Sequence, residues 1–531
     1  MTRACLKSWF TGAMLASLIV ASASAQAPLR IGSITDGPWN RDQMLLATFQ
    51  SKIVEAVGDA RDVQFPADKQ LNADWSTKGS KKALNQLLAD SQVDLILTLG
   101  LTSSAEVATR KSLGKPVIAT RVIAPEILKA PSKKVRNQTV SGVKNLSYIT
   151  IEGVDLLQRL GAFRQIVPFS RLTFMMLEPL EDLIPKLGAR LASDLAPLNL
   201  SGANVIFVGD SIGPALADIP PGAEAVVLTP LPQLDSVEYQ KLLSTLVDIG
   251  LPTFSLGGTT EDVAMGVMAG VTAPHEVEAL ADRTAANVKS IVAGKDAGEL
   301  SIGLRVKESF TVNTKVAAAL GITFDQGPMA DAEETSDEHA SEANPSMSAV
   351  TQENAESEAR IARQVQRLIA RQSTYSAFDG INFAVKGNKV ILLGHAWRPT
   401  TKRGLEKAIG QIEGVELESY VEVLSNSSFD NDIRARVYGS IYAHPVLRRY
   451  APGGGLNSVS VQQAIGDLLR FGLESVQMVR GPHPIHIVVK NGDVALVGVV
   501  QSDVDRQVAA TQARRVSGVF SVENHLQVAR R

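Results

Sequence analysis

The chain has 531 residues, of which 45% are hydrophobic and 5% aromatic, and its formal net charge at pH 7 is −2. This length predicts three or four domains, and the apolar content allows each of them to bury a core. The sequence has no phosphate loop, no dinucleotide fingerprint and no interleaved aromatic and basic residues, which argues against a nucleic-acid partner and predicts no cofactor.

The N-terminal segment has the pattern of a secretory signal. A short basic segment precedes an apolar run at 9–20, and A-S-A-S-A-Q-A follows at 21–27. We predict a signal peptide at 1–25, because the apolar run is shorter than the roughly 20 residues that a membrane span needs. The single cysteine, Cys5, precedes the apolar run, so the mature chain would have no thiol for disulfides, nucleophilic catalysis or metal binding.

Residues 28–325 alternate between short apolar runs and longer helical patterns. The apolar runs are continuous, without polar alternation, which is typical of parallel strands buried on both faces. Nearly 300 residues of this pattern exceed one ordinary doubly wound sheet, so we predict an α/β domain with two lobes. The predicted strands lie at 29–34, 93–99, 116–122, 171–177, 204–208, 225–229 and 252–256, with helices at 40–57 and 78–90.

Polar residues follow several of these strands at their carboxyl ends, where parallel sheets bind ligands. Ser103 and Glu106 have capping-box spacing, so we expect a helix to begin there, with free backbone N–H groups suited to an anion. The alternative is that these residues only cap helices and bind nothing. The candidate ligand-binding residues are Asp36, Trp39, Thr102, Ser103, Ser104, Arg121, Asp210, Ser211, Ser255 and Thr259.

Through five segments of its sequence, the region 29–325 resembles the substrate-binding proteins of ABC transporters that have the periplasmic-binding-protein type I fold. The carrying segments are V-D-L-I-L-T-L-G-L-T-S-S-A at 93–105, G-K-P-V-I-A-T at 114–120, G-L-P-T-F-S-L at 250–256, V-A-M-G-V-M-A-G at 263–270 and F-T-V-N-T-K-V-A-A-A-L-G-I at 310–322. The resemblance implies a small-molecule ligand and a transporter permease as partners.

The same resemblance implies two lobes that are joined by three crossings and close on the ligand. The crossings are expected near 145–152, 263–272 and 300–310. Relatives often carry a Tyr pair after the segment that matches 263–270, whereas this chain has V-T-A-P-H-E there. The ligand class, a small organic molecule that includes anionic candidates, therefore stays open.

One motif suggests an enzyme. G-D-S-I-G at 209–213 follows a predicted strand, as the nucleophile elbow of a serine hydrolase would, with Ser211 as nucleophile and Asp262 and His275 downstream. Pro214 and the Pro pair at 220–221 leave little room for the helix that an elbow requires. We therefore predict a protein without catalytic residues and keep the hydrolase as a remote alternative.

Residues 326–358 carry nine Asp or Glu, no Lys or Arg and no aromatic residue. Such a segment cannot bury enough apolar area to offset its chain entropy, so we predict an acidic flexible linker. Residues 360–531 carry 22 Lys or Arg and 14 Asp or Glu, a net charge of +8. The linker predicts that the domains on its two sides move independently.

A ten-residue pattern occurs twice after the linker, at 385–394 and 489–498, with an offset of 104 residues. Each copy predicts the order helix, strand, strand, helix, strand. The modules are expected at 359–425 and 430–528, the second with an insertion at 451–482 that contains a helix near 459–471. Four glycines are predicted to be structural, at close backbone approaches or turns: Gly394, Gly498, Gly414 and Gly518.

On V-K-N-G-D-V-A-L-V-G-V-V at 489–500 and G-V-F-S-V-E-N-H-L-Q-V at 518–528, the second module resembles the BON domain family, and the first is a weaker match. The resemblance implies small α/β modules of bacterial envelope proteins that bind phospholipid or another envelope component, and hence a periplasmic location, peripheral to a membrane. The basic charge suits an anionic membrane surface, although it could equally be a solvated surface.

Five of the seven histidines fall in the modules, and we predict that they lie on the surface. His483 and His486 have H-x-x-H spacing, but a predicted strand and Pro484 spoil the helical geometry of a metal pair, so no metal site is expected. The favoured interpretation is an exported solute-binding protein with envelope-attaching modules. The alternative is an envelope adaptor or sensor whose cleft has lost its ligand.

Overall fold

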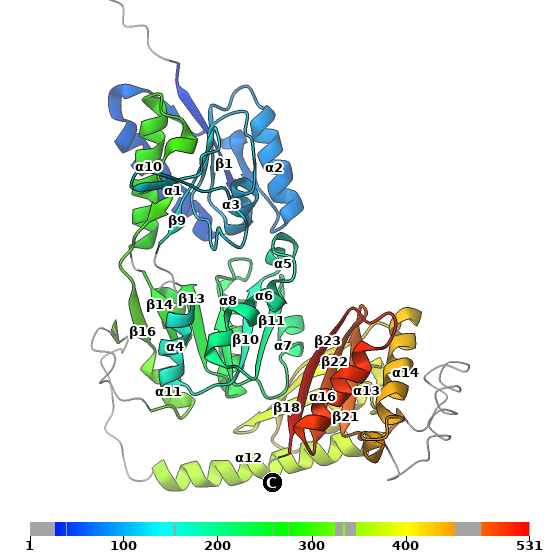
Figure 1. Ribbon diagram of the computed structural model, residues 1–531. Helices are drawn as coiled ribbons and strands as arrows, with labels where there is room; N and C mark the ends of the chain where they lie inside the picture. Colours follow the sequence, from blue (N-terminus) through cyan, green and yellow to red (C-terminus); the bar gives the residue numbers. More distant parts are fainter. Residues whose placement is uncertain are drawn as a thin grey trace, which may run out of the picture.

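The computed structural model describes residues 27–38, 40–152, 156–258, 260–273, 275–323, 333–334, 347–451 and 479–529. The predicted signal peptide with Cys5, the side chains of Trp39 and Thr259, and the predicted helix near 459–471 lie outside these residues. The described part forms two α/β lobes and, beside the second lobe, two small α/β modules (Figure 1).

Lobe 1 is built on a parallel sheet whose strands are buried on both faces, as the continuous apolar runs predict. The helices α1 and α10 cover one face, and α2 and α3 cover the other. The sheet has the order β2-β1-β4-β5-β8, with β3 also paired to β1. Its elements are β1 (Leu29–Thr35), α1 (Asn40–Val57), β2 (Val63–Gln64), β3 (Gln70–Asn72), α2 (Thr77–Ala89), β4 (Leu95–Thr98), α3 (Leu101–Ala108), β5 (Val117–Ala119), the hairpin β6 (Lys133–Val135) and β7 (Gln138–Val140), β8 (Leu146–Tyr148) and α10 (Glu276–Val292).

Lobe 2 has a sheet of the order β11-β10-β12-β13-β14-β16-β17, in which only the β14–β16 pair is antiparallel. Separate apolar clusters fill the two faces of this sheet. Its elements are α4 (Leu156–Ile166), β10 (Arg171–Leu177), α5 (Pro179–Leu183), α6 (Leu187–Asp194), β11 (Gly202–Val208), α7 (Ile212–Ala217), β12 (Ala225–Leu228), α8 (Ser236–Asp248), β13 (Thr253–Gly258), α9 (Thr260–Met265), β14 (Ala269–Thr272), β16 (Ser309–Val312), α11 (Thr314–Ala319) and β17 (Glu333–Glu334).

The chain passes between the lobes three times. The first crossing follows β9 (Thr150–Ile151) and the third follows β15 (Gly303–Leu304), and these two strands pair with each other. Both crossings lie close to the predicted positions. The second crossing, predicted near 263–272, follows directly after that segment, between the end of β14 of lobe 2 at Thr272 and the start of α10 of lobe 1 at Glu276. The buried residues at the end of this segment form the strand β14, so the resemblance placed the crossing a few residues too early.

The two modules have the predicted order of elements. Each has a three-stranded sheet with an antiparallel and a parallel pair, in the orders β18-β19-β20 and β21-β22-β23. Their elements are α12 (Met347–Arg371), β18 (Gly380–Lys386), β19 (Lys389–Ala396), α13 (Pro399–Gly410), β20 (Glu416–Val423), α14 (Ser428–Tyr442), β21 (Ile485–Lys490), β22 (Asp493–Val500), α16 (Asp503–Arg514) and β23 (Ser521–Val528).

The predicted structural glycines lie at strained or crowded positions. Gly394 and Gly498 have φ angles of +102° and +132°, and a Cβ atom there would lie 2.0 and 2.1 Å from a backbone oxygen of the neighbouring strand. Gly414 and Gly518 have φ angles of +73° and +94° in the turns before the last strands. Only glycine adopts these conformations without strain.

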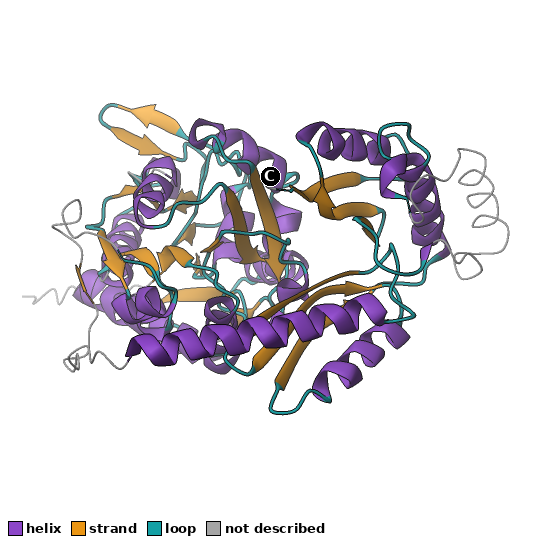
Figure 2. Ribbon diagram, turned by 90° about the horizontal axis from the view of Figure 1, so that it is seen from below, coloured by secondary structure: helices purple, strands orange, loops and turns teal. Residues whose placement is uncertain are grey.

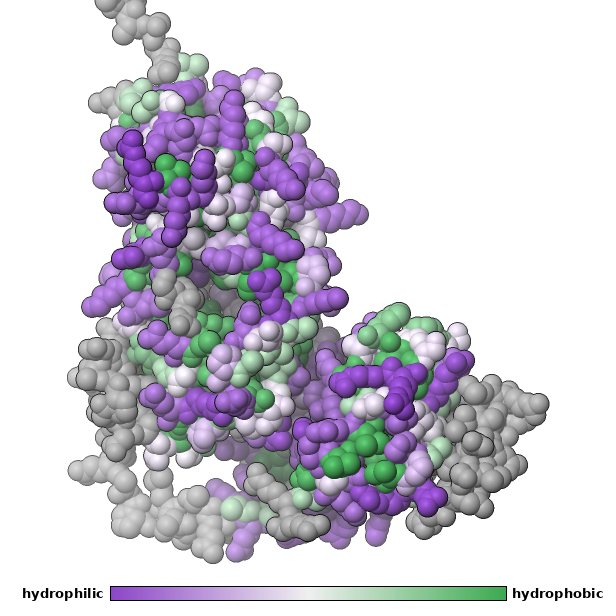
Figure 3. Space-filling model, in the orientation of Figure 1, coloured by the Kyte–Doolittle hydropathy of each residue, from purple (hydrophilic) through white to green (hydrophobic). Residues whose placement is uncertain are grey.

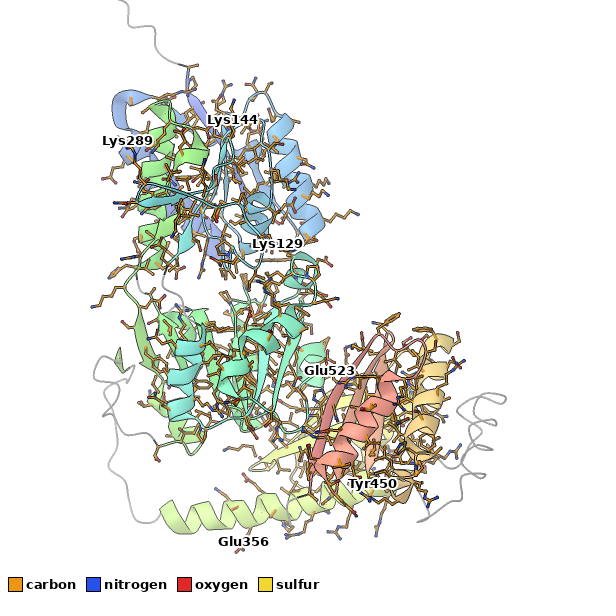
Figure 4. All side chains as sticks on the ribbon, in the orientation of Figure 1. Lys129, Lys144, Lys289, Glu356, Tyr450 and Glu523 are labelled. Carbon is orange, nitrogen blue, oxygen red and sulfur yellow. The ribbon has the colours of Figure 1, made fainter. Side chains whose placement is uncertain are left out.

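The first module packs against lobe 2. Ile391 and Leu393 on the outer face of β19 belong to the same apolar cluster as Leu216 of α7 and Leu242 of α8. Two ion pairs flank this contact, Lys241 with Glu418 and Lys389 with Asp248. The expectation that the domains on the two sides of the linker move independently is therefore wrong, because an apolar interface holds the first module to lobe 2. Figure 4 shows the side chains of this region, with Glu523 of β23 labelled on the module side.

The helix α12 begins at Met347, inside the predicted linker 326–358. The C-terminal part of that segment is therefore helical, and the linker prediction is wrong from residue 347 onward. The described apolar side chains of α12, Ile361 and Val365, pack against the first module, which gives the helix a tertiary partner that composition alone does not reveal. Figure 2 shows α12 running across the molecule in the view from below. No helix among the described residues is long and apolar enough to cross a membrane.

Candidate functional site

The carboxyl ends of the central strands in the two lobes face each other. In both sheets the first strand of the lobe lies second in the sheet, so that the chain order reverses between β1 and β4 and between β10 and β12. Ligands of open α/β sheets bind at such switch points. The helices that follow β4 and β10, α3 and α5, contact each other across the lobes. Figure 3 shows the surface hollowed between the lobes, and this cleft is the candidate site.

The switch point of lobe 1 is closed by a carboxylate of the chain itself. Asp36, after β1, accepts hydrogen bonds from the backbone N–H groups of Thr102 (2.7 Å) and Ser103 (2.8 Å). Burial raises the pKa of Asp36 above its ordinary value, and the hydrogen bonds from Ser103 and Thr102 oppose that rise. The N-terminus of α3 is therefore not free for an anion, contrary to the expectation from the sequence.

The capping-box prediction at Ser103 is also wrong, because α3 begins at Leu101 and Gly100 is its N-cap. A Cβ atom at Gly100 would lie 2.0 Å from the Asp36 carboxylate, so glycine is required for this cap. Thr102, Ser103 and Ser104 are all buried, and the Ser104 hydroxyl lies 3.1 Å from that of Thr98. The structure thus brings Asp36, Thr102 and Ser103 together, as a helix cap.

Arg121 is the cationic candidate at this cleft. It follows β5, and its guanidinium lies 2.9 Å from Glu276 Oε1 at the start of α10 and 3.4 Å from the carbonyl oxygen of Gly257 in lobe 2. It therefore joins the two lobes and one of the crossings. Both contacts use Nη2, and the Nε of Arg121 makes no hydrogen bond within the described residues.

The candidate ligand-binding residues of lobe 2 lie on the side of the cleft opposite lobe 1. Asp210 and Ser211 are exposed after β11, whereas Ser255 is buried within β13. A second contact between the lobes is a hydrogen bond of 3.2 Å from Thr77 of α2 to Asp182 of α5. Asp210 and Ser211 are thus at the edge strand of the sheet and Ser255 is inside it, so the structure does not gather these three residues at one point.

Trp75 is a cleft residue that the sequence interpretation missed. Its indole ring covers Gly37, where a Cβ atom would lie 1.7 Å from the ring. Trp75 follows β3, which pairs with the end of β1, and its φ angle is +51°. The strand that positions Trp75, β3 at 70–72, has only three residues, so periodicity could not predict it. Trp75 supplies an aromatic surface beside Asp36, whose carbonyl oxygen accepts a hydrogen bond from the Trp75 N–H.

The geometry of a serine hydrolase is not formed at Ser211. Ser211 caps α7, which has only six residues, and its hydroxyl accepts a hydrogen bond of 3.4 Å from the Gly213 N–H. His275 follows β14, which lies four strand positions from β11 in the sheet. Strands are about 4.8 Å apart, so the two ends are separated by about 19 Å, beyond the reach of a serine–histidine hydrogen bond.

The prediction that the module histidines lie on the surface is wrong. His395, His483 and His486 are buried, and neither His444 nor His525 is fully exposed. His483 and His486 lie among aromatic rings, such as those of Tyr375, Tyr438 and Tyr442. These residues form an aromatic cluster between the modules, and the surface interpretation had not considered such a contact.

Comparison with known proteins found similarities to two parts of the chain. Residues 469–530 match the model of the BON domain. An ABC-domain protein in complex with L-Trp from Streptococcus pneumonia has 15% identity and a TM-score of 0.45, covering 58% of this chain and 99% of that one. A conserved domain protein from Vibrio cholerae has 14% identity and a TM-score of 0.46, covering 58% and 99%.

The branched-chain amino acid transporter substrate-binding protein LivJ from Streptococcus pneumoniae, in complex with isoleucine, has 12% identity and a TM-score of 0.37, covering 54% and 96%. No curated protein sequence matches the chain. The predicted BON module is confirmed at 469–530. The two-lobed α/β fold predicted for 29–325 is confirmed by its two strand orders and three crossings.

Proposed function

We propose that the chain is an exported solute-binding protein of an ABC transport system, whose two lobes close on a small organic ligand. The observation that carries this proposal is that two switch points face each other across lobes joined by three crossings. This arrangement suits hinge closure around a ligand. Removal of residues 1–25 in the mature protein, measured by intact mass, would test export.

We predict that replacing Arg121 with Met weakens ligand binding. Arg121 contacts both lobes, so its loss affects the closed form in particular, and a carboxylate ligand would also lose its cationic partner. The measurement is the melting temperature of the full chain with L-tryptophan, L-isoleucine, other amino acids and sugars. A ligand at 100 times its Kd should stabilise the protein by about 2.7 kcal/mol.

The matched control is Arg110→Met, because Arg110, just after α3, pairs with Glu106 of that helix and makes no described contact with lobe 2. Binding that is equal in the Arg121 and Arg110 variants would show that Arg121 is outside the site. If no compound of the panel stabilises the chain and a protein partner is recovered instead, the envelope adaptor with a degenerate cleft is the better function.

We propose further that the C-terminal part attaches to anionic phospholipid through α12. Arg360, Arg363, Arg367 and Arg371 recur at helical spacing on this helix, all are exposed, and none forms an ion pair with a described acidic residue. The opposite side of the helix, with Ile361 and Val365, packs on the first module. Such a row of arginines attracts an anionic membrane surface, at about 1 kcal/mol per charge.

The double substitution Arg363→Gln and Arg367→Gln should therefore weaken liposome binding by about 2 kcal/mol, or roughly 30-fold. Sedimentation with vesicles of anionic and of purely zwitterionic phospholipid is the measurement. Lys81→Gln with Lys82→Gln removes the same charge from exposed positions of α2 in lobe 1 and is the control. Equal losses in both double variants would mean that net charge, rather than α12, determines binding.

A further inference from the structure

Four charged or titratable side chains meet where lobe 2 and the two modules come together. Asp218 ends α7 of lobe 2, His395 and Glu422 are paired residues of β19 and β20 in the first module, and Lys490 ends β21 of the second. His395 Nε2 lies 3.0 Å from Asp218 Oδ1 and 3.6 Å from Glu422 Oε2. No step of ligand binding in the cleft uses this cluster.

The cluster has the donor set of a metal site. One imidazole nitrogen and two carboxylate oxygens come from three different elements, and these atoms all lie within 4.8 Å of one another. Zn²⁺ binds such nitrogen and oxygen ligands at about 2.0–2.2 Å, which corresponds to ligand atoms roughly 3–3.5 Å apart in a tetrahedral site. Two of the separations are already near this value, and a small shift of the Glu422 side chain completes the set.

His395 gives independent support for a cation at this point. Its side chain is nine-tenths buried and directed at the two carboxylates, yet Nε2 makes no hydrogen bond of good geometry. When the proton of the neutral imidazole is on Nδ1, the Nε2 lone pair faces two negative oxygens, which is unfavourable unless a cation lies between them. Asp218 and Glu422 are partly exposed, so an ion has a path from solvent to the buried nitrogen.

The ammonium of Lys490 competes with a metal ion for the two carboxylates of this cluster. It lies 3.3 Å from Asp218 Oδ2 and 3.1 Å from Glu422 Oε2, so the carboxylates already attract a positive charge. The Lys490 side chain is 43% exposed and flexible, and it can turn its ammonium into solvent. A divalent ion that coordinates His395 as well as both carboxylates has one ligand more than the ammonium has.

We propose that Asp218, His395 and Glu422 bind a divalent transition metal ion, such as Zn²⁺, with water completing the coordination, and that the ion fastens the first module to lobe 2. Metal and ammonium compete for the same two carboxylates. The site therefore links the ion to the position of Lys490, and through it to the second module. This inference is independent of the ligand cleft.

Titration calorimetry of the metal-free full chain with Zn²⁺ tests the proposal. One equivalent should bind, His395→Ala should weaken binding at least tenfold, and Lys490→Gln should tighten it several-fold because the competing charge is gone. Co²⁺ in place of Zn²⁺ should give a visible absorption band that His395→Ala abolishes. His275→Ala, which removes an exposed histidine outside the cluster, is the control.

The Lys490 variant keeps the test decisive even if His395→Ala disturbs the interface, since it retains all three ligands. Binding that persists unchanged in His395→Ala, or that weakens in Lys490→Gln, would overturn the proposal. The proposal also fails if Zn²⁺ does not bind and the docking of the module depends on pH alone, because the cation of the cluster would then be a proton on His395.

Discussion

Replacing Leu393 with Asp is expected to detach the repeated modules from lobe 2. Leu393 is 6% exposed and shares an apolar cluster with Leu216 of α7 and Leu242 of α8. The substitution removes about 2–3 kcal/mol of apolar burial and adds a carboxylate that has no partner in this cluster. The docked arrangement should therefore lose about 4 kcal/mol or more of stability, so we expect the interface to open.

The flanking ion pairs cannot compensate for this loss. Lys241–Glu418 and Lys389–Asp248 are partly exposed, and such pairs contribute about 0–1 kcal/mol each. The radius of gyration of the full chain should therefore rise, and the amides of α7 and α8 should exchange faster with deuterium. These two measurements report opening directly, without an assay for the ligand.

The repeat supplies a matched control. Val499 lies on the same face of the corresponding strand in the second module and is 51% exposed, so Val499→Asp should change the stability by less than about 0.5 kcal/mol. Unchanged exchange at α7 and α8 in Leu393→Asp would show that the apolar cluster does not hold the module in solution.

The sequence of β19 already contained the signal for this interface. In K-V-I-L-L-G-H-A at 389–396 both faces carry apolar residues, Val390 and Leu392 on one and Ile391 and Leu393 on the other, whereas a strand of a small sheet needs only one apolar face. The corresponding face of the strand at 493–500 carries Ala495, Val497 and Val499, which are smaller than Ile391 and Leu393. A comparison of the two copies, face by face, therefore favours the first as the one whose second face is covered, because its apolar side chains are larger.

The cap of α3 by Asp36 had no such signal. The two partners are 66 and 67 residues apart, and they meet because β1 and β4 are neighbours in the sheet. Periodicity and composition predicted seven strands and two helices of the lobes, since these depend on local pattern, but they missed short strands such as β3. The order of strands is set by packing of the whole lobe, so which polar residues meet at a switch point could not be derived from one sequence.

A further expected result concerns two buried groups with opposite pH dependence at the junction of the modules. Asp379 accepts hydrogen bonds from the Ser376 N–H (2.8 Å) and the Trp397 N–H (2.7 Å), while His486 Nδ1 lies 3.1 Å from the Ser376 carbonyl oxygen. Burial raises the pKa of Asp379 to about 6 and lowers the pKa of His486 to about 4.

The two titrations act on stability with opposite signs. Below pH 6.5 His486 binds a proton in the unfolded chain but stays neutral in the folded chain. The free energy of unfolding therefore falls as the pH decreases towards 4. Asp379 binds its proton in the folded chain near pH 6 but in the unfolded chain only near 3.8, so the stability rises over that interval. Each effect amounts to about 2 kcal/mol between pH 6.5 and 4.5, and the two nearly cancel.

Single variants should reveal how each group alone changes the free energy of unfolding with pH. Compared with the unmodified chain, His486→Gln should gain about 2 kcal/mol of stability on acidification from pH 6.5 to 4.5, because only the Asp379 term remains. Asp379→Asn should lose about the same amount, because only the His486 term remains. Urea unfolding, followed by pulsed hydrogen exchange of β21, measures the free energy of unfolding of the module pair at each pH.

Other carboxylates titrate in this range, so the informative quantity is the slope of each variant relative to the unmodified chain. His275→Gln, which changes an exposed histidine in another domain, should keep the original slope. Two variants with slopes of the same sign would contradict the argument, because one buried acid and one buried base must shift the pH dependence in opposite directions. Opposite slopes would show that the junction holds both groups uncharged near pH 5, where burial penalises either charge.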